Sequence, residues 1–167
     1  MIYKYLDSNL FALSTVSLKD TLSVYIINGI SGKVVYKFSV DNVSAEHPID
    51  MVLSENQFVL AFKRQSWGIP QQELLVTEFF SSKEETDTMK LLKDFYLHSE
   101  KRLTQHEFNS YQMEAPVIIQ ESYTLTVDVK KLCLTQSMQH VTSKSLVILT
   151  SNDQVYTLEA AMFTARR

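Results

Sequence analysis

The chain is poor in cysteine, glycine and proline: its 167 residues include one, three and three of these, respectively. A single cysteine, Cys133, excludes an intrachain disulfide, a zinc site with four thiolate ligands and a CxxC redox pair. Leucines flank Cys133 on both sides in a strand-like run, so we expect its thiol to be buried and unreactive.

Long hydrophobic runs are also absent. The longest apolar stretches, such as residues 146–149, are far shorter than the roughly twenty residues of a membrane-spanning helix. The first residues lack a basic segment followed by an apolar core, so they do not resemble a signal peptide. The sequence opens almost at once in a strand-like pattern and stops at Arg167 just after another such pattern. We therefore expect a piece of a longer protein.

Charge and catalytic motifs are equally sparse. Sixteen Lys and Arg against nineteen Asp and Glu give a net charge of −3, which argues against a nucleic-acid partner because phosphate binding needs a basic face. The four histidines show no metal-ligand spacing, and GxSxG, GxGxxG and Walker motifs are absent. Acidic pairs such as Asp50 with Glu55 are typical of solvated surface. The sequence therefore predicts no catalytic, cofactor-binding or metal-binding residue.

Residues that favour strands are abundant. The chain is 45% hydrophobic and 11% aromatic, which is enough to build a core. Short runs rich in Val, Ile, Tyr and Phe alternate with polar turns, and this pattern is typical of an all-β fold. It predicts strands at residues 10–15, 22–27, 34–40, 57–62, 74–80, 117–125, 129–138, 144–150 and 154–159.

Two turns have a clear signature. Asn28, Gly29 and Gly32 provide positions where a positive φ costs little, so the segment around them is predicted to be the turn of a hairpin. Residues 151–153, Ser-Asn-Asp, predict a second turn from side chains that bond their own backbone.

Residues 63–72 are polar and include Gly68 and Pro70, so we expect them to form a loop between two strands. The only tryptophan of the chain, Trp67, lies in this loop. Aromatic side chains are frequent anchors at protein interfaces, which makes Trp67 a candidate partner contact. The alternative is a tryptophan that folds over its own sheet.

The segment at residues 81–113 differs from the rest. Ser82 and Glu85 have the spacing of a capping box, and apolar residues then follow at helical intervals. We expect one short helix around residues 83–98, packed on its own sheet or docked on a partner or membrane. The predicted organisation is thus propeller blades at 1–80, a helical or loop insertion at 81–113 and closing blade strands at 114–167, all within one larger domain.

The strand groups repeat loosely along the chain. The apolar stretches after Asn9 and Asn56 start about 47 residues apart, close to the period of roughly 40 to 50 residues found in β-propeller blades. Any all-β chain produces frequent strands, so the spacing alone leaves a β-propeller and a β-sandwich open.

One sequence motif predicts a modification. Asn42, Val43 and Ser44 form an Asn-X-Ser sequon after a predicted strand. Asn42 is therefore a candidate N-glycosylation site, provided that the segment enters the secretory lumen.

Five segments, in order along the chain, resemble the C-terminal lumenal region of the ER membrane protein complex subunit 1 family. Residues 81–113 match that family poorly, and Asn152-Asp153 replace the glycine usual in its last turn. The matching segments are YKYLDSNL at 3–10, VYIINGISGKVV at 24–35, SEN at 54–56, QESY at 120–123 and VTSKSLVIL at 141–149.

The resemblance implies a lumenal β-propeller region of a large single-pass subunit, membrane-anchored outside this segment. The complex of that family inserts tail-anchored and multipass proteins into the endoplasmic reticulum membrane. This region is then expected to be a scaffold for other subunits and membrane protein clients rather than an enzyme. Two alternatives remain: a cytosolic β-sandwich interaction module, and an enzyme with a pocket between blades that uses His47, Asp50 and Cys133.

Overall fold

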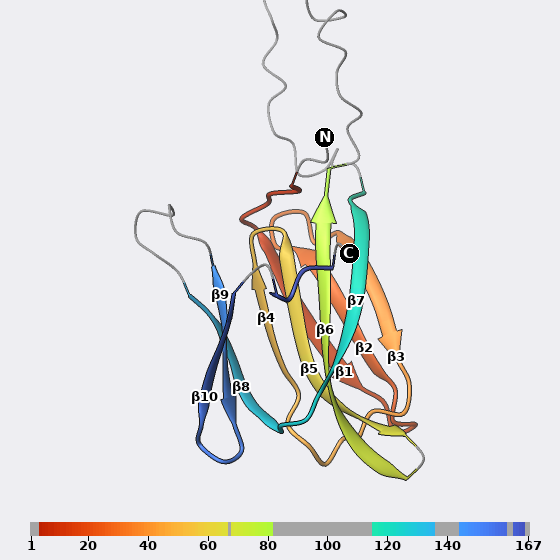
Figure 1. Ribbon diagram of the computed structural model, residues 1–167. Helices are drawn as coiled ribbons and strands as arrows, with labels where there is room; N and C mark the ends of the chain where they lie inside the picture. The colour runs from red at the N-terminus through yellow and green to blue at the C-terminus, as the bar shows by residue number, and fades with distance from the viewer. Residues whose placement is uncertain (1–3, 67, 82–114, 136–143, 160–161, 166–167) are drawn as a thin grey trace, which may run out of the picture.

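The structure is a computed structural model that describes residues 4–66, 68–81, 115–135, 144–159 and 162–165 (Figure 1). The described residues form ten strands in three antiparallel sheets and no α-helix. Among them, no helix has the length and hydrophobicity to cross a bilayer. The all-β prediction is confirmed, whereas the helix expected around residues 83–98 lies outside the described residues.

Each sheet is a meander in which neighbours in sequence pair with each other. The three sheets hold three, four and three strands in chain order. The strands are β1 (Leu10–Val16), β2 (Leu22–Asn28) and β3 (Val34–Val40); β4 (Asp50–Ser54), β5 (Gln57–Ser66), β6 (Ile69–Phe80) and β7 (Val117–Leu125); and β8 (Val129–Leu134), β9 (Ser145–Thr150) and β10 (Val155–Glu159).

The middle sheet is buried on both faces. Along β5, successive side chains point to opposite sides, so Phe58, Leu60 and Phe62 pack against the first sheet. Val59 and Ala61 pack on the other face, against the third sheet. This double burial explains why β5 is an unbroken apolar run rather than an alternating one.

The first strands of the three sheets lie along one edge of the stack. β4 contacts β1 on one side and β8 on the other. Figure 1 shows the sheet β8–β10 standing beside the middle sheet, with β1–β3 behind it. Successive small antiparallel meanders with their first strands gathered together are the arrangement of blades around a propeller axis. A β-sandwich would have two sheets, so the sandwich alternative is wrong.

The turn between β2 and β3 is built around Asn28. The buried Asn28 side chain accepts hydrogen bonds through Oδ1 from the backbone N–H groups of Ile30 and Ser31, at 3.0 and 2.9 Å. Gly32 has φ +68°, in the left-handed region that suits glycine. Gly29 donates its N–H to the carbonyl of Asn9 at 2.8 Å, and a Cβ on Gly29 would lie 3.3 Å from that oxygen.

Strand positions expose two errors in the sequence interpretation. Residues 63–72 are not a loop: β5 and β6 continue through them in register from Lys63↔Gln72 to Ser66↔Ile69. These residues are polar because this part of the strand pair extends beyond the hydrophobic core, although its backbone is still paired. The sequence interpretation also overlooked β4, so its 47-residue spacing compared β1 with β5, the second strand of its sheet. The corresponding first strands start at Leu10, Asp50 and Val129.

Cys133 is exposed, which contradicts the buried thiol expected from its neighbours. In β8 the side chains of Leu132 and Leu134 turn toward the core and pack in the interface with the middle sheet. Cys133, between them, points outward by the alternation of a strand. Flanking leucines therefore identify the buried face of β8 and not the environment of the cysteine.

Candidate functional site

The β5–β6 hairpin projects beyond the middle sheet. β4 pairs with β5 only as far as Ala61, and β7 pairs with β6 only as far as Gln72. Beyond these residues β5 and β6 continue to pair with each other, without β4 or β7, to a two-residue turn where Gly68 has φ +80°. In Figure 1 this ribbon twists away from the lower end of the sheet. The projecting hairpin is the most distinctive surface of the described residues and the candidate site for a partner.

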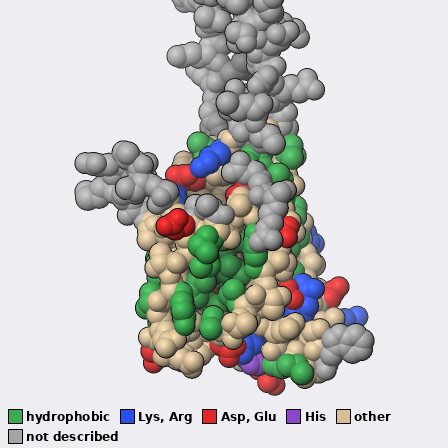
Figure 2. All heavy atoms as spheres, viewed as in Figure 1, with side chains coloured by type: hydrophobic (Ala, Val, Ile, Leu, Met, Phe, Trp, Pro, Cys, Tyr) green, Lys and Arg blue, Asp and Glu red, His purple; other side chains and the backbone are tan. Residues whose placement is uncertain are grey.

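The end of the hairpin exposes apolar surface. Ile69 is 69% exposed, and Pro70 beside it is also exposed. Figure 2 shows charged side chains of both signs toward the lower part of the molecule, whereas hydrophobic side chains gather over its middle. An exposed apolar tip on a polar ribbon is the composition expected of a small docking element.

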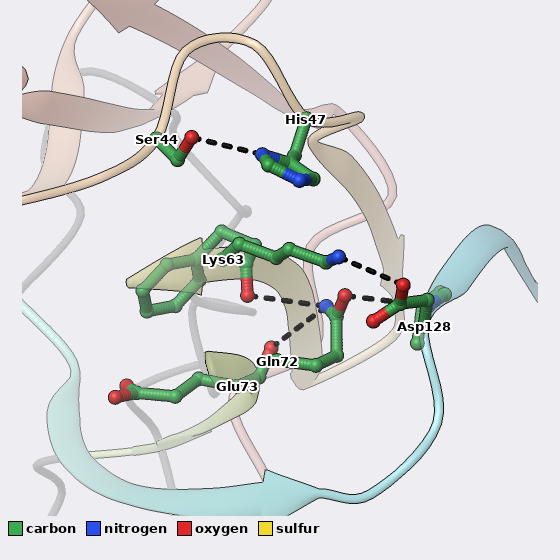
Figure 3. A network of polar contacts seen from close by, with 8 residues as sticks. Ser44, His47, Lys63, Gln72, Glu73 and Asp128 are labelled. Atoms are coloured by element: carbon green, nitrogen blue, oxygen red, sulfur yellow. Dashed lines mark hydrogen bonds and ion pairs between the residues drawn. The ribbon is translucent and has the colours of Figure 1, made fainter. Parts of the chain in front are cut away.

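The base of the hairpin is fixed to the third sheet by an ion pair (Figure 3). Lys63 Nζ lies 2.8 Å from Asp128 Oδ2, in the connection between β7 and β8. Lys63 is buried and Asp128 is half exposed, so this carboxylate compensates a charge that burial would otherwise penalise. The pair ties the projecting ribbon to the point where the chain enters the next sheet.

Gln72 completes the base from the opposite strand. Its buried Nε2 donates to the carbonyl of Phe62 at 3.1 Å, and its Oε1 accepts the N–H of Val129 at 3.3 Å. One side chain thus satisfies backbone groups of β5 and of β8 together (Figure 3). The angle at which the hairpin leaves the stack therefore depends on Gln72.

We expect Gln72→Ala to loosen this junction. The substitution removes the side-chain hydrogen bonds that Gln72 makes to the carbonyl of Phe62 and to the N–H of Val129, and the loss of a buried hydrogen bond costs roughly 1–3 kcal/mol. Gln71→Ala is the matched control, because the neighbouring Gln71 is exposed. Hydrogen exchange of the purified full-length protein should show faster exchange in the hairpin for Gln72→Ala alone. Equal rates in the two variants would contradict the role of Gln72.

Above the base, charged groups line the side of the ribbon. Arg64 Nε lies 3.2 Å from Glu73 Oε1 across the strand pair, and the guanidinium stacks 5.7 Å from the ring centre of Phe62. Ser122 of β7 donates to the other oxygen of Glu73 at 3.3 Å. These contacts connect β5, β6 and β7 where the ribbon leaves the sheet.

The outer edge of β5 is covered by the connection between β3 and β4. Ser44 donates its N–H to the carbonyl of Lys63 at 2.9 Å, and Gln65 donates its N–H to the carbonyl of Asn42 at 2.7 Å. Ser44 Oγ also lies 2.9 Å from Nδ1 of His47, within the same connection (Figure 3). The hairpin is thus held on this side as well as at its base.

Asp50 links the middle and third sheets at their inner strands. Its carboxylate accepts hydrogen bonds from the backbone N–H of Leu132 and from Nζ of Lys131, the latter at 2.7 Å. The hydrogen bond with Asp50 raises the pKa of the Lys131 ammonium above its ordinary value. The Asp50 side chain is only 15% exposed, so the expectation of a solvated carboxylate was wrong.

A second link runs parallel to the first. Lys144, immediately before β9, donates to Ser54 Oγ at 2.6 Å and lies 2.9 Å from Glu55 Oε1. The C-terminal segment is bound to the middle sheet as well, because Tyr123 of β7 donates its hydroxyl to the carbonyl of Thr164 at 2.6 Å. The two sheets are therefore joined by polar contacts as well as by their apolar faces.

The residues singled out in the sequence do not converge on one centre. Asn42 is exposed with φ +59°, and His47 lies in the same connection as Asn42. Trp67 lies outside the described residues, so its role as a partner contact stays a prediction. Within the described ranges, no group of three His, Cys, Asp or Glu side chains is placed to hold a metal.

The polar residues that organise the hairpin base escaped the sequence analysis. Lys63 and Gln72 face each other across a ribbon that looked like a loop, and Asp128 precedes a strand without any motif. A buried Lys and Gln are recognisable only after the strands have been paired. The available signal for a long hairpin was Gly68, which lies midway between the apolar runs at residues 57–62 and 74–80.

A protein-family model described as "ER membrane protein complex subunit 1, second beta-propeller" matches residues 1–167, the entire chain. The chain belongs to this family. The family resemblance inferred from sequence motifs is confirmed, and so is the assignment of the three sheets as part of a β-propeller.

Two curated relatives carry the name ER membrane protein complex subunit 1. The chain is 24% identical to the Schizosaccharomyces pombe protein over 168 residues, which cover the whole chain and 17% of the relative. It is 25% identical to the Xenopus laevis protein over 176 residues, which cover the whole chain and 15% of the relative. The chain therefore corresponds to a small part of either relative.

Proposed function

We propose that the chain is a lumenal scaffold region of the ER membrane protein complex, and that it supports assembly and partner docking rather than catalysis. Family membership over the whole chain supports the link to that complex. The insertion of tail-anchored and multipass proteins is then the activity of the assembly, with its membrane anchor outside this chain. The lumenal side of the endoplasmic reticulum membrane is the proposed location.

The observation that carries a docking role is the projecting β5–β6 hairpin. Its base is fixed by Lys63, Gln72 and Asp128, so the exposed end is presented in a defined direction. A preorganised element loses little conformational entropy when it binds. Ile69 at the exposed end, together with Trp67, which precedes it by two residues in the sequence, is the proposed contact with another subunit or a membrane protein client.

The stacked sheets support a scaffold role in a second way. Both faces of the middle sheet are buried against neighbouring sheets, and polar links between Asp50 and Leu132 and between Lys144 and Ser54 reinforce one of these interfaces. Such a stack holds the hairpin and the sheet ends at fixed relative positions. That rigidity is useful for a surface that several proteins contact at once.

The hairpin proposal is tested by affinity purification of the full-length protein. Ile69→Asp places a charge in the proposed interface, and we expect several-fold less of at least one co-purifying membrane protein. Ile30→Asp is the matched control, because Ile30 is 60% exposed on the turn between β2 and β3. Equal recovery of all partners from both variants and the wild type would contradict docking at the hairpin.

A further inference from the structure

The connection between β3 and β4 holds its sequon at a fixed and accessible point. Asn42 is exposed, whereas the next residue, Val43, is completely buried and pairs as an isolated bridge with Arg64 of β5. The side chain of Asn42 is therefore directed away from the core.

Three backbone hydrogen bonds hold this connection in place. Val43 donates to the carbonyl of Asp20 at 2.8 Å, Ser44 donates to Lys63, and Gln65 donates to Asn42. Asn42 itself has φ +59°, a conformation that Asn tolerates better than most residues. A group attached to the side-chain amide of Asn42 would therefore disturb neither the backbone of this connection nor the packing of Val43.

We propose that Asn42 carries an N-linked glycan. The chemistry is transfer from a lipid-pyrophosphate-linked oligosaccharide: Nδ2 of Asn42 bonds to the anomeric carbon, the lipid pyrophosphate leaves, and the amide nitrogen loses one proton. Asn42-Val43-Ser44 is the only sequon among the 167 residues. This inference rests on the lumenal location given under Proposed function, because the transfer takes place on that side of the membrane.

The folded structure also indicates when the transfer must occur. Ser44, whose hydroxyl completes the sequon, is partly buried and bonded to His47 at 2.9 Å. A transferase that binds the Ser44 hydroxyl would therefore have to act before this segment packs against β5. The glycan would then remain on the exposed Asn42, whose carbonyl accepts the N–H of Gln65 in β5. A bulky polar group there would cover the solvent-facing side of the connection that pairs with β5.

The experiment is mass spectrometry of the Asn42 peptide from the full-length protein, with and without enzymatic glycan removal. We expect a glycan in the wild type, in Ser44→Thr, which keeps a sequon, and in His47→Ala, which removes only the bond to Ser44. Asn42→Gln and Ser44→Ala should both lose it completely. A glycan present in Ser44→Ala, or absent from Asn42 in the wild type, would overturn the proposal.

A second sequon, introduced by mutation, tests the lumenal location separately from the glycosylation of Asn42. Gln154→Thr turns the exposed Asn152 in the β9–β10 turn into an Asn-Asp-Thr acceptor. If Asn152 is glycosylated in that variant while Asn42 is bare, the site assignment is wrong and the lumenal location stands. If both are bare, the lumenal location fails and the proposal fails with it.

Discussion

Phe58→Ala should destabilise the stack of sheets more than any other single change discussed for this chain. Phe58 is completely buried where β5 packs on the first sheet, and its ring meets the edge of Phe38 at a centroid distance of 6.2 Å. Removal of a buried phenylalanine ring costs about 3–5 kcal/mol, because lost burial adds to the cavity that remains. The interface between the first two sheets should therefore open.

The measurement is hydrogen exchange in β2 and β5 of the full-length protein, together with the amount recovered in the assembled complex. Phe58→Leu is the matched variant, since it keeps more of the apolar volume than alanine does and should cost less than Phe58→Ala. Exchange in Phe58→Ala should rise in both strands, because they share one core. Protection equal to that of Phe58→Leu would mean that the two sheets do not depend on this contact.

Asp50→Ala should weaken the join between the middle and third sheets. The carboxylate is the acceptor for the backbone N–H of Leu132, and hydrogen bonds to charged groups contribute about 1.5–3 kcal/mol. Lys131→Ala is the control: its side chain is 67% exposed, so solvent screens its ion pair with Asp50 and the pair should contribute little. The effect of Asp50 is thus expected to act through the backbone of β8.

The hydrogen-exchange rate of the Leu132 amide distinguishes the backbone hydrogen bond of Asp50 from its ion pair with Lys131. Asp50→Ala should accelerate it strongly, whereas Lys131→Ala should leave it close to the wild-type rate. Asp50→Asn keeps an acceptor oxygen without the charge and should fall between the two. A large effect of Lys131→Ala, equal to that of Asp50→Ala, would show that the ion pair and not the backbone bond joins the sheets.

The strands that could be predicted are those whose local pattern matches their tertiary environment. β2, β3 and β7 follow runs of β-branched and aromatic residues bounded by polar turns, and β7 occupies the predicted bounds, Val117–Leu125. The turn at residues 29–33 has a local cause as well, because Asn28 bonds the backbone two and three residues ahead.

The features that escaped prediction depend on partners far away in the sequence. β4 is short, and its first residue is an acidic side chain whose hydrogen-bond donor lies 82 residues later, at Leu132. The polar half of the β5–β6 hairpin is stabilised from outside, by Asp128 and by the connection at residues 42–44. Neither interaction leaves a signature within a window of ten residues, so local polarity was mistaken for a loop.

The exposed position of Cys133 illustrates the same limit. A leucine on either side signals a strand with one buried face, but the register decides which residues occupy that face. In β8 the register shifts between Val129 and Lys131, at the start of the strand. Such a shift changes the orientation of all later side chains, and the sequence alone does not reveal it.

The central claim is that these three sheets are consecutive blades of a lumenal propeller in the ER membrane protein complex. The most direct measurement is an electron cryomicroscopy structure of the complex purified through the full-length protein. The account predicts β1, β4 and β8 side by side nearest a common axis, on the lumenal side of the membrane, with the β5–β6 hairpin against a neighbouring protein. Density that places this chain on the cytosolic side, or folds it as a closed two-sheet sandwich, would contradict it.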